Sequence, residues 1–388
     1  MRVAITSRIY RPEPSAASLF LGAVADDLTA RGDEVVVLTA RLPRGVKPLD
    51  SVEEVRTFPA VRDRQGYIRG YVPYLSFDIP LAFRLLFLRR PDVVFLEPPP
   101  TTGVVVRVIC ALRRIPYVYD AADIWSDAAD QATGSRLVIR VLRAMERFGM
   151  RGARRLVAIS QGVVYRARAL GVERPIEVTG FGADTSAFTP DASVPVEPVF
   201  VYAGSYSPWH GADALAEAFA IFSRDHPGYR LRFIGNGSER EVIEQRAAEA
   251  GVADSVDFVA AVPAEDLLPH LNGAVATLAT LRPNTAYEYA FTTKAYSSLA
   301  AGCPVLFAGP GPTSRFIAEA NTHVRAGIAC DYDVTQIAAA MSRLAEERLS
   351  SEERDDLGRW TAAEHSLAVV ASRVSDTIAE VAAEAGGR

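Results

Sequence analysis

The sequence predicts an α/β protein built from two doubly wound parallel-sheet domains that face each other across a cleft. Its 388 residues suit two domains of ordinary size. Short β-branched runs alternate with helix-length amphipathic segments from end to end, which is the pattern of βαβ units whose sheet is covered on both faces. A segment punctuated by prolines and without helical period, residues 190–198, separates two such series and is expected to be a linker.

The first series fills residues 1–189, the predicted N-terminal domain. Its strands should be buried on both faces because the runs are almost wholly apolar. The predicted strands are Val3–Ser7, Glu34–Thr39, Asp92–Glu97, Tyr117–Asp120 and Leu156–Ser160. The predicted helices, with apolar residues at helical spacing, are Leu19–Arg31, Ile79–Leu88, Thr102–Leu112 and Ser135–Arg147.

The second series fills residues 199–365, the predicted C-terminal domain. Its predicted strands are Val199–Ala203, Leu231–Ile234, Val256–Val259, Ala274–Leu278 and Pro304–Phe307. Its predicted helices are Ala212–Ser223, Glu239–Gly251, Glu265–Leu271, Thr293–Ala300 and Val334–Arg348. A last helical pattern runs over Ala362–Ala383, and residues 366–388 are expected to pack back toward the N-terminal domain.

Composition excludes several classes of protein. Apolar residues make up 49% of the chain and charged residues 23%, the balance of a globular enzyme. Three scattered cysteines indicate neither a disulfide framework nor a zinc site, and neither a leader nor a membrane-spanning stretch is recognisable. We therefore expect a cytoplasmic protein that binds no metal and no nucleic acid.

Charge and rare residues are unevenly distributed. Residues 1–190 hold 27 basic and 20 acidic residues, whereas residues 191–388 hold 15 and 27. The only lysines are Lys47 and Lys294, and all five histidines lie at or beyond His210. A histidine base from the N-terminal domain is thus excluded.

Loops that follow the strands are where ligands bind in such sheets. After the first strand, the small residues Ser15 and Ala16 begin a helix, where free backbone N–H groups favour a phosphate; Ser15 alone is also an ordinary N-cap. After the first strand of the second domain, Gly204 allows close backbone approach, and His210 could add a cation or a hydrogen-bond donor. Both loops also suit ordinary strand–helix turns.

A polar loop over residues 282–292 runs into a helix that carries Lys294 in its first turn. A lysine there opposes the helix dipole, so the placement favours a lysine that joins the N–H groups in holding an anion. Residues 233–239 contain the GxG of Gly235 and Gly237 without the third glycine of a dinucleotide fingerprint.

Acidic residues follow the fourth predicted strand. Asp120 and Asp123 could hold sugar hydroxyls or a cation, while Asp123 and Asp127 also suit helix caps. The DxD pattern of residues 331–333 precedes a helix, where aspartate is a common cap, so it is not interpreted as a metal site.

In this order the loops resemble the retaining nucleotide-sugar glycosyltransferases of the GT-B fold, family 4 in particular, over nearly the whole chain. The matching segments are Pro14–Ala17 before Asp33–Thr39, Arg90–Val94, Ile115–Asp120, Asp123–Trp125, Val157–Ser160, Gly180–Asp184 with Phe188 and Pro190, Tyr202–Gly204, Phe233–Gly237, Thr293–Tyr296 and Leu299–Val305. The branch resembled acts in polysaccharide, lipopolysaccharide and antibiotic sugar transfer. The resemblance implies two Rossmann-like domains.

The resemblance implies a hexosyl or related transferase that uses no cofactor and takes a nucleoside diphosphate sugar, a UDP- or GDP-sugar, as co-substrate. Lys294 and Asp123 would be catalytic. The donor would contact Ser15, Ala16, Gly204, Ser205, His210, Gly235, Asn236, Gly237, Val262, Glu288, Thr292, Thr293, Ser297 and Ser298. The acceptor, a glycan, a lipid-linked sugar or an antibiotic-type small molecule, would lie near Glu97, Asp120 and Trp125.

The chain departs from the family pattern at several positions. Ser297 stands where a ribose-binding glutamate is frequent, and Glu288 is one position away from its usual partner. The basic phosphate-binding residues after the strand are replaced around Ser205 and His210, and Ala122 stands where a histidine is frequent. Lys294 would then carry more of the phosphate charge than is usual, or the donor would be held differently.

We expect retention at the anomeric carbon, with the leaving phosphate taking the acceptor proton. Inversion would need Asp120, Asp123, Glu13 or Glu97 as the base. The alternatives are a nucleotide-sugar epimerase and a partner or regulator of this fold that has lost catalysis, which the serine at position 297 would suit. The apolar segment Ile79–Leu88, with its arginines, also suits a peripheral contact with the inner face of a membrane. The oligomeric state is left open.

Overall fold

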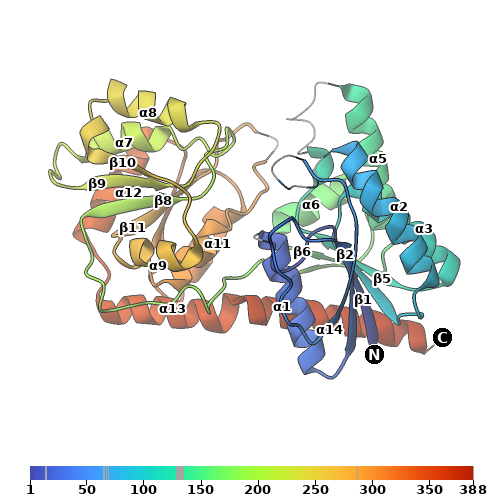
Figure 1. Cartoon of the computed structure of the whole chain (residues 1–388). Helices are drawn as coiled ribbons and strands as arrows, with labels where there is room; N and C mark the ends of the chain where they lie inside the picture. The colour runs from blue at the N-terminus through green and yellow to red at the C-terminus, as the bar shows by residue number, and fades with distance from the viewer. Residues whose placement is uncertain are drawn as a thin grey trace. The chain divides into compact units, whose positions relative to one another are not determined.

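The computed structural model describes residues 1–13, 15–63, 66, 68, 70–127, 135–285 and 287–387. Pro14 and Ala286, which belong to two of the motifs above, lie outside the described residues. The chain forms two compact units: unit 1 comprises residues 1–181 and 367–388, and unit 2 comprises residues 182–366 (Figure 1). Each unit is a parallel sheet flanked by helices, so the predicted α/β class with two parallel-sheet domains is confirmed.

Unit 1 contains a seven-stranded sheet in the order β3-β2-β1-β4-β5-β6-β7, in which every pairing is parallel. The strands are β1 (Arg2–Thr6), β2 (Glu34–Ala40), β3 (Glu54–Phe58), β4 (Val93–Leu96), β5 (Tyr117–Ala121), β6 (Arg155–Ala158) and β7 (Ile176–Val178). The helices are α1 (Ala16–Ala30), α2 (Tyr71–Phe87), α3 (Pro100–Arg113), α5 (Arg136–Gly152), α6 (Gln161–Ala169) and α14 (Leu367–Gly386).

Helices α1 and α14 pack against each other and share a core with the sheet. Val370, Val374 and Ile378 of α14 are completely buried in that core. Helices α2, α3 and α5 form a second group, in which α3 packs between the other two (Figure 1). Strands β1, β4 and β5 are buried along their length, which explains why their sequences are continuously apolar rather than alternating.

Unit 2 contains a six-stranded sheet in the order β10-β9-β8-β11-β12-β13, again with parallel pairings throughout. The strands are β8 (Val199–Ala203), β9 (Arg230–Ile234), β10 (Val256–Val259), β11 (Ala276–Thr280), β12 (Val305–Ala308) and β13 (Gly327–Cys330). The helices are α7 (Ala214–Phe222), α8 (Arg240–Glu249), α9 (Ala264–Asn272), α10 (Lys294–Ala300), α11 (Pro312–Ala320), α12 (Val334–Glu346) and α13 (Ser351–His365), and a 3₁₀ turn spans Ala253–Ser255.

Differences from the sequence-based elements lie mostly at the sheet edges and chain end. The expected single helix over residues 362–383 is wrong: α13 ends at His365, and α14 begins at Leu367 after Ser366, whose backbone is extended. The chain passes between units at residues 181–182 and 366–367, whereas residues 190–198 lie inside unit 2. In this segment Pro190 packs tightly on Gly358 of α13: a β-carbon added to Gly358 would lie 2.3 Å from the Pro190 ring.

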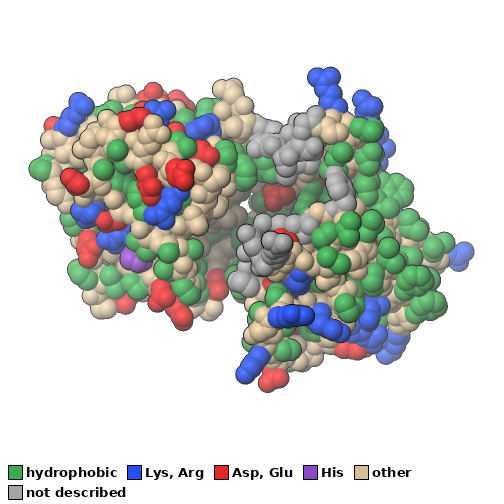
Figure 2. Space-filling view, turned by 45° about the horizontal axis from the view of Figure 1, so that its top comes forward, with side chains coloured by type: hydrophobic (Ala, Val, Ile, Leu, Met, Phe, Trp, Pro, Cys, Tyr) green, Lys and Arg blue, Asp and Glu red, His purple; other side chains and the backbone are tan. Residues whose placement is uncertain are grey.

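Exposed large hydrophobic side chains are concentrated on unit 1. Figure 2 shows hydrophobic side chains spread over one side of unit 1. Phe83 and Phe87 of α2 are 61% and 79% exposed, and Leu112 of α3 is 70% exposed. Within the described part of unit 2, only Ile221 and Val242 belong to this group. No helix among the described residues combines the length and the apolar character needed to cross a bilayer.

Candidate functional site

Each sheet reverses its strand order at one point, and the loops there are the natural place for a ligand. In unit 1 the reversal lies between β1 and β4, and in unit 2 between β8 and β11. Glu97 follows β4 and Gly204 follows β8, so both predicted positions stand at the carboxyl ends of strands that border a reversal.

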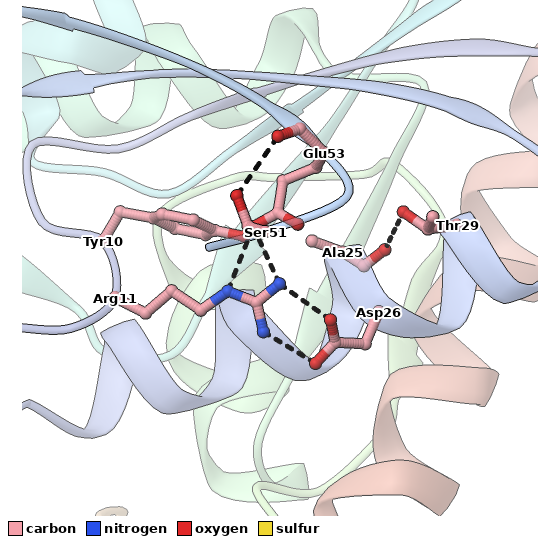
Figure 3. Close-up of polar contacts among 7 residues, drawn as sticks. All are labelled: Tyr10, Arg11, Ala25, Asp26, Thr29, Ser51 and Glu53. Atoms are coloured by element: carbon pink, nitrogen blue, oxygen red, sulfur yellow. Dashed lines mark hydrogen bonds and ion pairs between the residues drawn. The ribbon is translucent and has the colours of Figure 1, made fainter. Parts of the chain in front are cut away.

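A polar network fixes the loop between β1 and α1 (Figure 3). The Tyr10 hydroxyl donates to Glu53 over 2.7 Å, and the Arg11 guanidinium bonds both Glu53 and Asp26 over 2.7 Å. At the end of this loop, the Ser15 side chain accepts from the Ser18 N–H over 3.1 Å and caps α1. Ser15 thus performs the ordinary capping role, while Ala16 is exposed at the start of the helix.

Two carboxyls lie buried at the carboxyl ends of β4 and β5. Glu97 accepts a hydrogen bond from the Ser7 hydroxyl over 2.9 Å, and burial raises its pKa. Burial, followed by the nearby charges of Glu97 and Asp123, raises the pKa of Asp120 well above its usual value. The folded protein therefore favours the protonated form of Asp120 more than water does.

Asp123 and Trp125 lie on the segment that follows β5, Asp123 in a bend and Trp125 at the start of the helical residues 125–127; this segment is called the loop below. Asp123 is exposed, yet desolvation raises the pKa of its carboxyl to about 6, so it is mostly ionised at pH 7. The buried carboxylate of Glu146 on α5 accepts from the backbone N–H groups of Trp125 and Ser126, over 2.7 and 3.1 Å. This side chain fixes two backbone groups of the segment.

Arg8 lies beside the same loop and was not anticipated from the sequence. Its guanidinium carbon is 4.8 Å from the centre of a Trp125 ring and 5.3 Å from that of Tyr74 on α2. Arg8 is 8% exposed, and its charge lowers the pKa values of Glu97 and Asp78 against the effect of burial. An arginine after a strand gives no sequence signal of such stacking.

In unit 2, three neighbouring loops are joined through glycine backbone. The N–H of Gly204 donates to Ile234 and that of Gly235 to Val259, while Tyr206 N–H donates to Asn236. Gly235 has a φ of +138°, and a β-carbon there would lie 2.1 Å from the Gly204 carbonyl oxygen. Gly237 is equally restricted by the Tyr206 backbone. The glycines therefore let the loops after β8 and β9 approach each other.

Lys294 reaches into this group of loops from the start of α10. Its Nζ lies 3.8 Å from the centre of the Tyr202 ring and so close to Gly204 that a β-carbon added there would be 3.4 Å away. Nζ is buried and has neither a hydrogen-bond nor an ion-pair partner among the described residues. Desolvation lowers the Lys294 pKa to about 7. A buried ammonium without a partner has an unfavourable free energy, which a bound anion would lower. This position is therefore a candidate anion-binding site.

His210 lies next to Lys294 as a neutral group. Burial, and then the Lys294 charge, lower its pKa to about 4. Its Nδ1 lies 3.0 Å from the Ser205 carbonyl oxygen, which only accepts, so Nδ1 carries the proton. The sequence left open whether His210 is a cation or a hydrogen-bond donor. In the structure it is a neutral hydrogen-bonding group.

The remaining predicted donor residues are distributed around this point. The N–H of Thr292 is already bonded to Thr313 over 2.9 Å, and the Ser298 hydroxyl donates to the Lys294 carbonyl over 3.0 Å. Glu288 accepts from the Asn284 N–H. The others are exposed or half-buried: Ser205, Asn236, Val262, Thr293 and Ser297. A further platform, which the sequence did not indicate, is the Trp209–Tyr287 ring stack with centres 5.3 Å apart.

Two Rossmann-like units with candidate ligand loops at the carboxyl ends of both sheets are the architecture of GT-B glycosyltransferases. The comparison with family models agrees with this assignment. Residues 17–182 match the "Glycosyl transferase 4-like domain", and residues 189–363 match "Glycosyl transferases group 1". The chain belongs to this family of glycosyltransferases.

Curated relatives share low identity over varied lengths. A D-inositol 3-phosphate glycosyltransferase of Acidothermus cellulolyticus is 28% identical over 46% of this chain, and the match spans 42% of that relative. A GDP-mannose-dependent alpha-mannosyltransferase of Mycolicibacterium smegmatis is 24% identical over 90% of each chain. The chain thus covers less than half the length of the first of these relatives and most of the second.

Solved structures share the fold over almost the whole chain. Sucrose-phosphate synthase from Thermosynechococcus elongatus superposes with a TM-score of 0.74 at 17% identity, covering 99% of this chain and 100% of that one. HepE of Anabaena, solved in complex with UDP, superposes with a TM-score of 0.71 at 14% identity, covering 98% and 100%. At such identities the likeness establishes the fold.

Proposed function

We propose that the protein transfers a hexosyl or related group from a nucleoside diphosphate sugar to an acceptor hydroxyl, with retention at the anomeric carbon. The observation that carries the proposal is the buried, unpaired ammonium of Lys294 beside Gly204. Its lowered pKa of about 7 means that an anion bound there would restore the proton and gain a charge-assisted hydrogen bond. A diphosphate supplies such an anion.

The surroundings of Lys294 support a diphosphate in particular. Gly204 is exposed, so a phosphate can approach the backbone without meeting a side chain. Asn236 and Gly237, on the loop joined to it, are also exposed and give the nucleoside a neighbouring surface. His210 is neutral at pH 7 because its pKa is about 4, so it adds no positive charge beside Lys294.

The chemistry follows from where charge develops. When the bond between the anomeric carbon and the phosphate oxygen breaks, negative charge grows on the diphosphate and positive charge on the sugar ring. Protonated Lys294 stabilises the first of these charges, and it does so without reorganisation because its ammonium is already held against Tyr202. The leaving phosphate oxygen then takes the proton of the acceptor hydroxyl.

The carboxyls of unit 1 favour retention over inversion. Glu13 is buried in an ion pair with Arg62, with an N···O distance of 2.7 Å, and so is committed to structure. Burial raises the pKa values of Asp120 and Glu97, which lowers the fraction of each carboxyl that is ionised and able to accept a proton. Asp123 remains as an ionised carboxylate, and we assign it to the acceptor or to the positively charged sugar ring.

Relatives guide the choice of donor. The mannosyltransferase of M. smegmatis is named as GDP-mannose-dependent, and the HepE structure contains UDP. GDP- and UDP-sugars are therefore the first two donors to test. Among acceptors, the relatives named for phosphatidylinositol mannoside and inositol phosphate favour a hydroxyl of a polar lipid headgroup or a related sugar.

The test is a thermal-shift series with UDP, GDP, dTDP and ADP on the full chain and on Lys294→Met, with Lys47→Met as the matched control. A ligand that binds the folded state raises Tm by mass action. We expect one base to raise Tm in the parent and in Lys47→Met and to lose most of that shift in Lys294→Met. Failure of all four nucleotides would contradict the proposal and favour a partner protein that has lost catalysis. An isomer of the donor sugar formed without acceptor would favour the epimerase.

A further inference from the structure

We infer that unit 1 docks on an anionic lipid bilayer through the outward side of α2, α3 and α5, called here the α2–α3–α5 face. The three helices lie side by side, with α3 in contact with both others (Figure 1). The inference about docking stands on this surface alone. Its consequence for the acceptor rests on the proposed function.

Helix α2 presents an apolar stripe to solvent. The stripe recurs every three or four residues and consists of Val72, Leu75, Ile79, Phe83 and Phe87, which are between 50% and 79% exposed. The opposite side of the helix, with Leu81 and Leu85, is completely buried. A helix that only covers a core is polar on its outer side, so two apolar sides indicate a second apolar environment.

Helices α3 and α5 extend the stripe into a broad surface. Leu112 of α3 is 70% exposed, and Leu137 and Val141 of α5 are 66% and 49% exposed. The guanidinium carbon of Arg107 on α3 lies 3.9 Å from the centre of the Phe148 ring on α5. The same guanidinium donates a hydrogen bond to the Phe148 carbonyl, so the two helices are linked. Hydrophobic side chains spread over this part of unit 1, with basic side chains at its margin (Figure 2).

Helix α5 adds a row of positive charge next to its apolar side chains. The exposed arginines recur at helical spacing and are Arg136, Arg140, Arg143, Arg147 and Arg151. Within the described residues, no carboxylate forms an ion pair with Arg136, Arg140 or Arg147. Arginines beside exposed aliphatic and aromatic side chains are the composition of helices that lie in the lipid headgroup region.

Acidic residues are missing from this face. The three helices contain two carboxylates, Asp78 and Glu146, and both are completely or almost completely buried. A second copy of the chain docked on the same face would bring two arginine rows together, which repel each other. An anionic bilayer satisfies both features at once, because its phosphates meet the arginines and its acyl boundary receives the apolar side chains.

The same helices hold the candidate acceptor loop. Tyr74 on α2 packs edge-on against Trp125, with ring centres 6.4 Å apart, and Glu146 on α5 holds the Trp125 backbone. The loop is therefore attached directly to two of the helices that would contact the bilayer. If the proposed function holds, the acceptor hydroxyl belongs to a lipid headgroup.

The test is co-sedimentation of the full chain with vesicles of phosphatidylcholine alone and of phosphatidylcholine mixed with phosphatidylglycerol. We expect binding to the mixed vesicles at low salt, weakened at about 1 M salt, where screening acts within about 3 Å. Reversing two charges, Arg140→Glu with Arg147→Glu, should reduce the bound fraction on the order of tenfold or more. Phe83→Ser with Phe87→Ser should remove the binding that survives high salt.

A matched control carries similar changes on unit 2, Arg224→Glu with Val242→Ser, and should bind vesicles like the parent. Absence of parent binding to mixed vesicles at low salt overturns the inference, as do equal losses in the control. A dimer in sedimentation analysis that Phe83→Ser with Phe87→Ser dissolves overturns it too. Nucleotide thermal shifts, measured without vesicles on every variant, report the donor site separately, so failure of the proposed function is distinguishable.

Discussion

The ammonium nitrogen of Lys294 lies over the Tyr202 ring, 3.8 Å from its centre. Tyr202 belongs to β8 and stands two residues before the exposed Gly204. The ring compensates the charge only in part, because a cation–π contact is weaker than a carboxylate contact. Desolvation by burial prevails and lowers the Lys294 pKa to about 7. The relationship explains how an acidic half of the chain can present a local site for an anion.

Replacing Lys294 by alanine should reduce turnover on the order of a hundredfold or more, as loss of one transition-state donor does. The rate of donor consumption at saturating donor measures this. Lys47→Ala, the exchange of an exposed lysine, should leave the rate unchanged. A rate for Lys294→Ala within threefold of the parent would remove Lys294 from the mechanism.

Donor affinity should fall as pH rises above 7. Below that pH the free protein already carries the charged ammonium, whereas above it donor binding must first restore a proton to Lys294. The affinity should then decrease by up to about tenfold for each pH unit, until the pKa of the complex is reached. Calorimetric titration between about pH 6 and 8.5 checks this, and a pH-independent affinity in the parent would contradict it. Lys294→Met should bind weakly at every pH.

Gly235→Ala should destabilise unit 2 more than Gly251→Ala. Both glycines have positive φ values, +138° and +72°, but only at Gly235 would a β-carbon collide with backbone. Gly251→Ala therefore has the conformational cost alone, about 1–2 kcal/mol. Denaturant unfolding measures the difference, and nucleotide binding below the transition should be lost only in Gly235→Ala. Equal stability of the two variants would contradict the described loop contact.

Asp120→Asn should raise Tm at pH 7 and have little effect near pH 4. In the unfolded chain the carboxyl ionises near 3.8, whereas its folded pKa is raised well above that value. The folded state thus holds a proton that the unfolded state releases, so stability falls as pH rises through this window. Each kcal/mol relieved should raise Tm by roughly 2–4 °C. Asp50→Asn at an exposed site is the control, and an equal change there would refute the assignment.

Most of the fold could be predicted because buried parallel strands have an unmistakable pattern. Strands β8 and β10 begin and end where the apolar runs do. Strands β3, β7 and β13 were missed because they lie at sheet edges and are mostly exposed or half-buried, so their sequences lack that pattern. Helix α2 begins at Tyr71, eight residues before the predicted start, because its first turns are apolar on the solvent side as well.

The site was predicted less completely because it depends on contacts between distant segments. The sequence singled out Lys294 through its rarity and its place in the helix, but nothing in it indicated that Lys294 would pack on Tyr202, a core residue of β8. Glu146 was hidden for a similar reason, since a glutamate on an arginine-rich helix is usually solvated. For Ser15 and Thr292, local hydrogen bonds decide the outcome, and these depend on the exact backbone path.

Helix α14 has a consequence for how the protein is made. Its residues Val370, Val374 and Ile378 complete the core of unit 1, although all of residues 182–366 are synthesised before them. During synthesis, the apolar side of α1 that packs against α14 therefore stays exposed until residues 182–366 have been made. The nascent chain is most exposed to aggregation in that interval, and a rearranged gene that encodes residues 367–387 ahead of Met1 would shorten it.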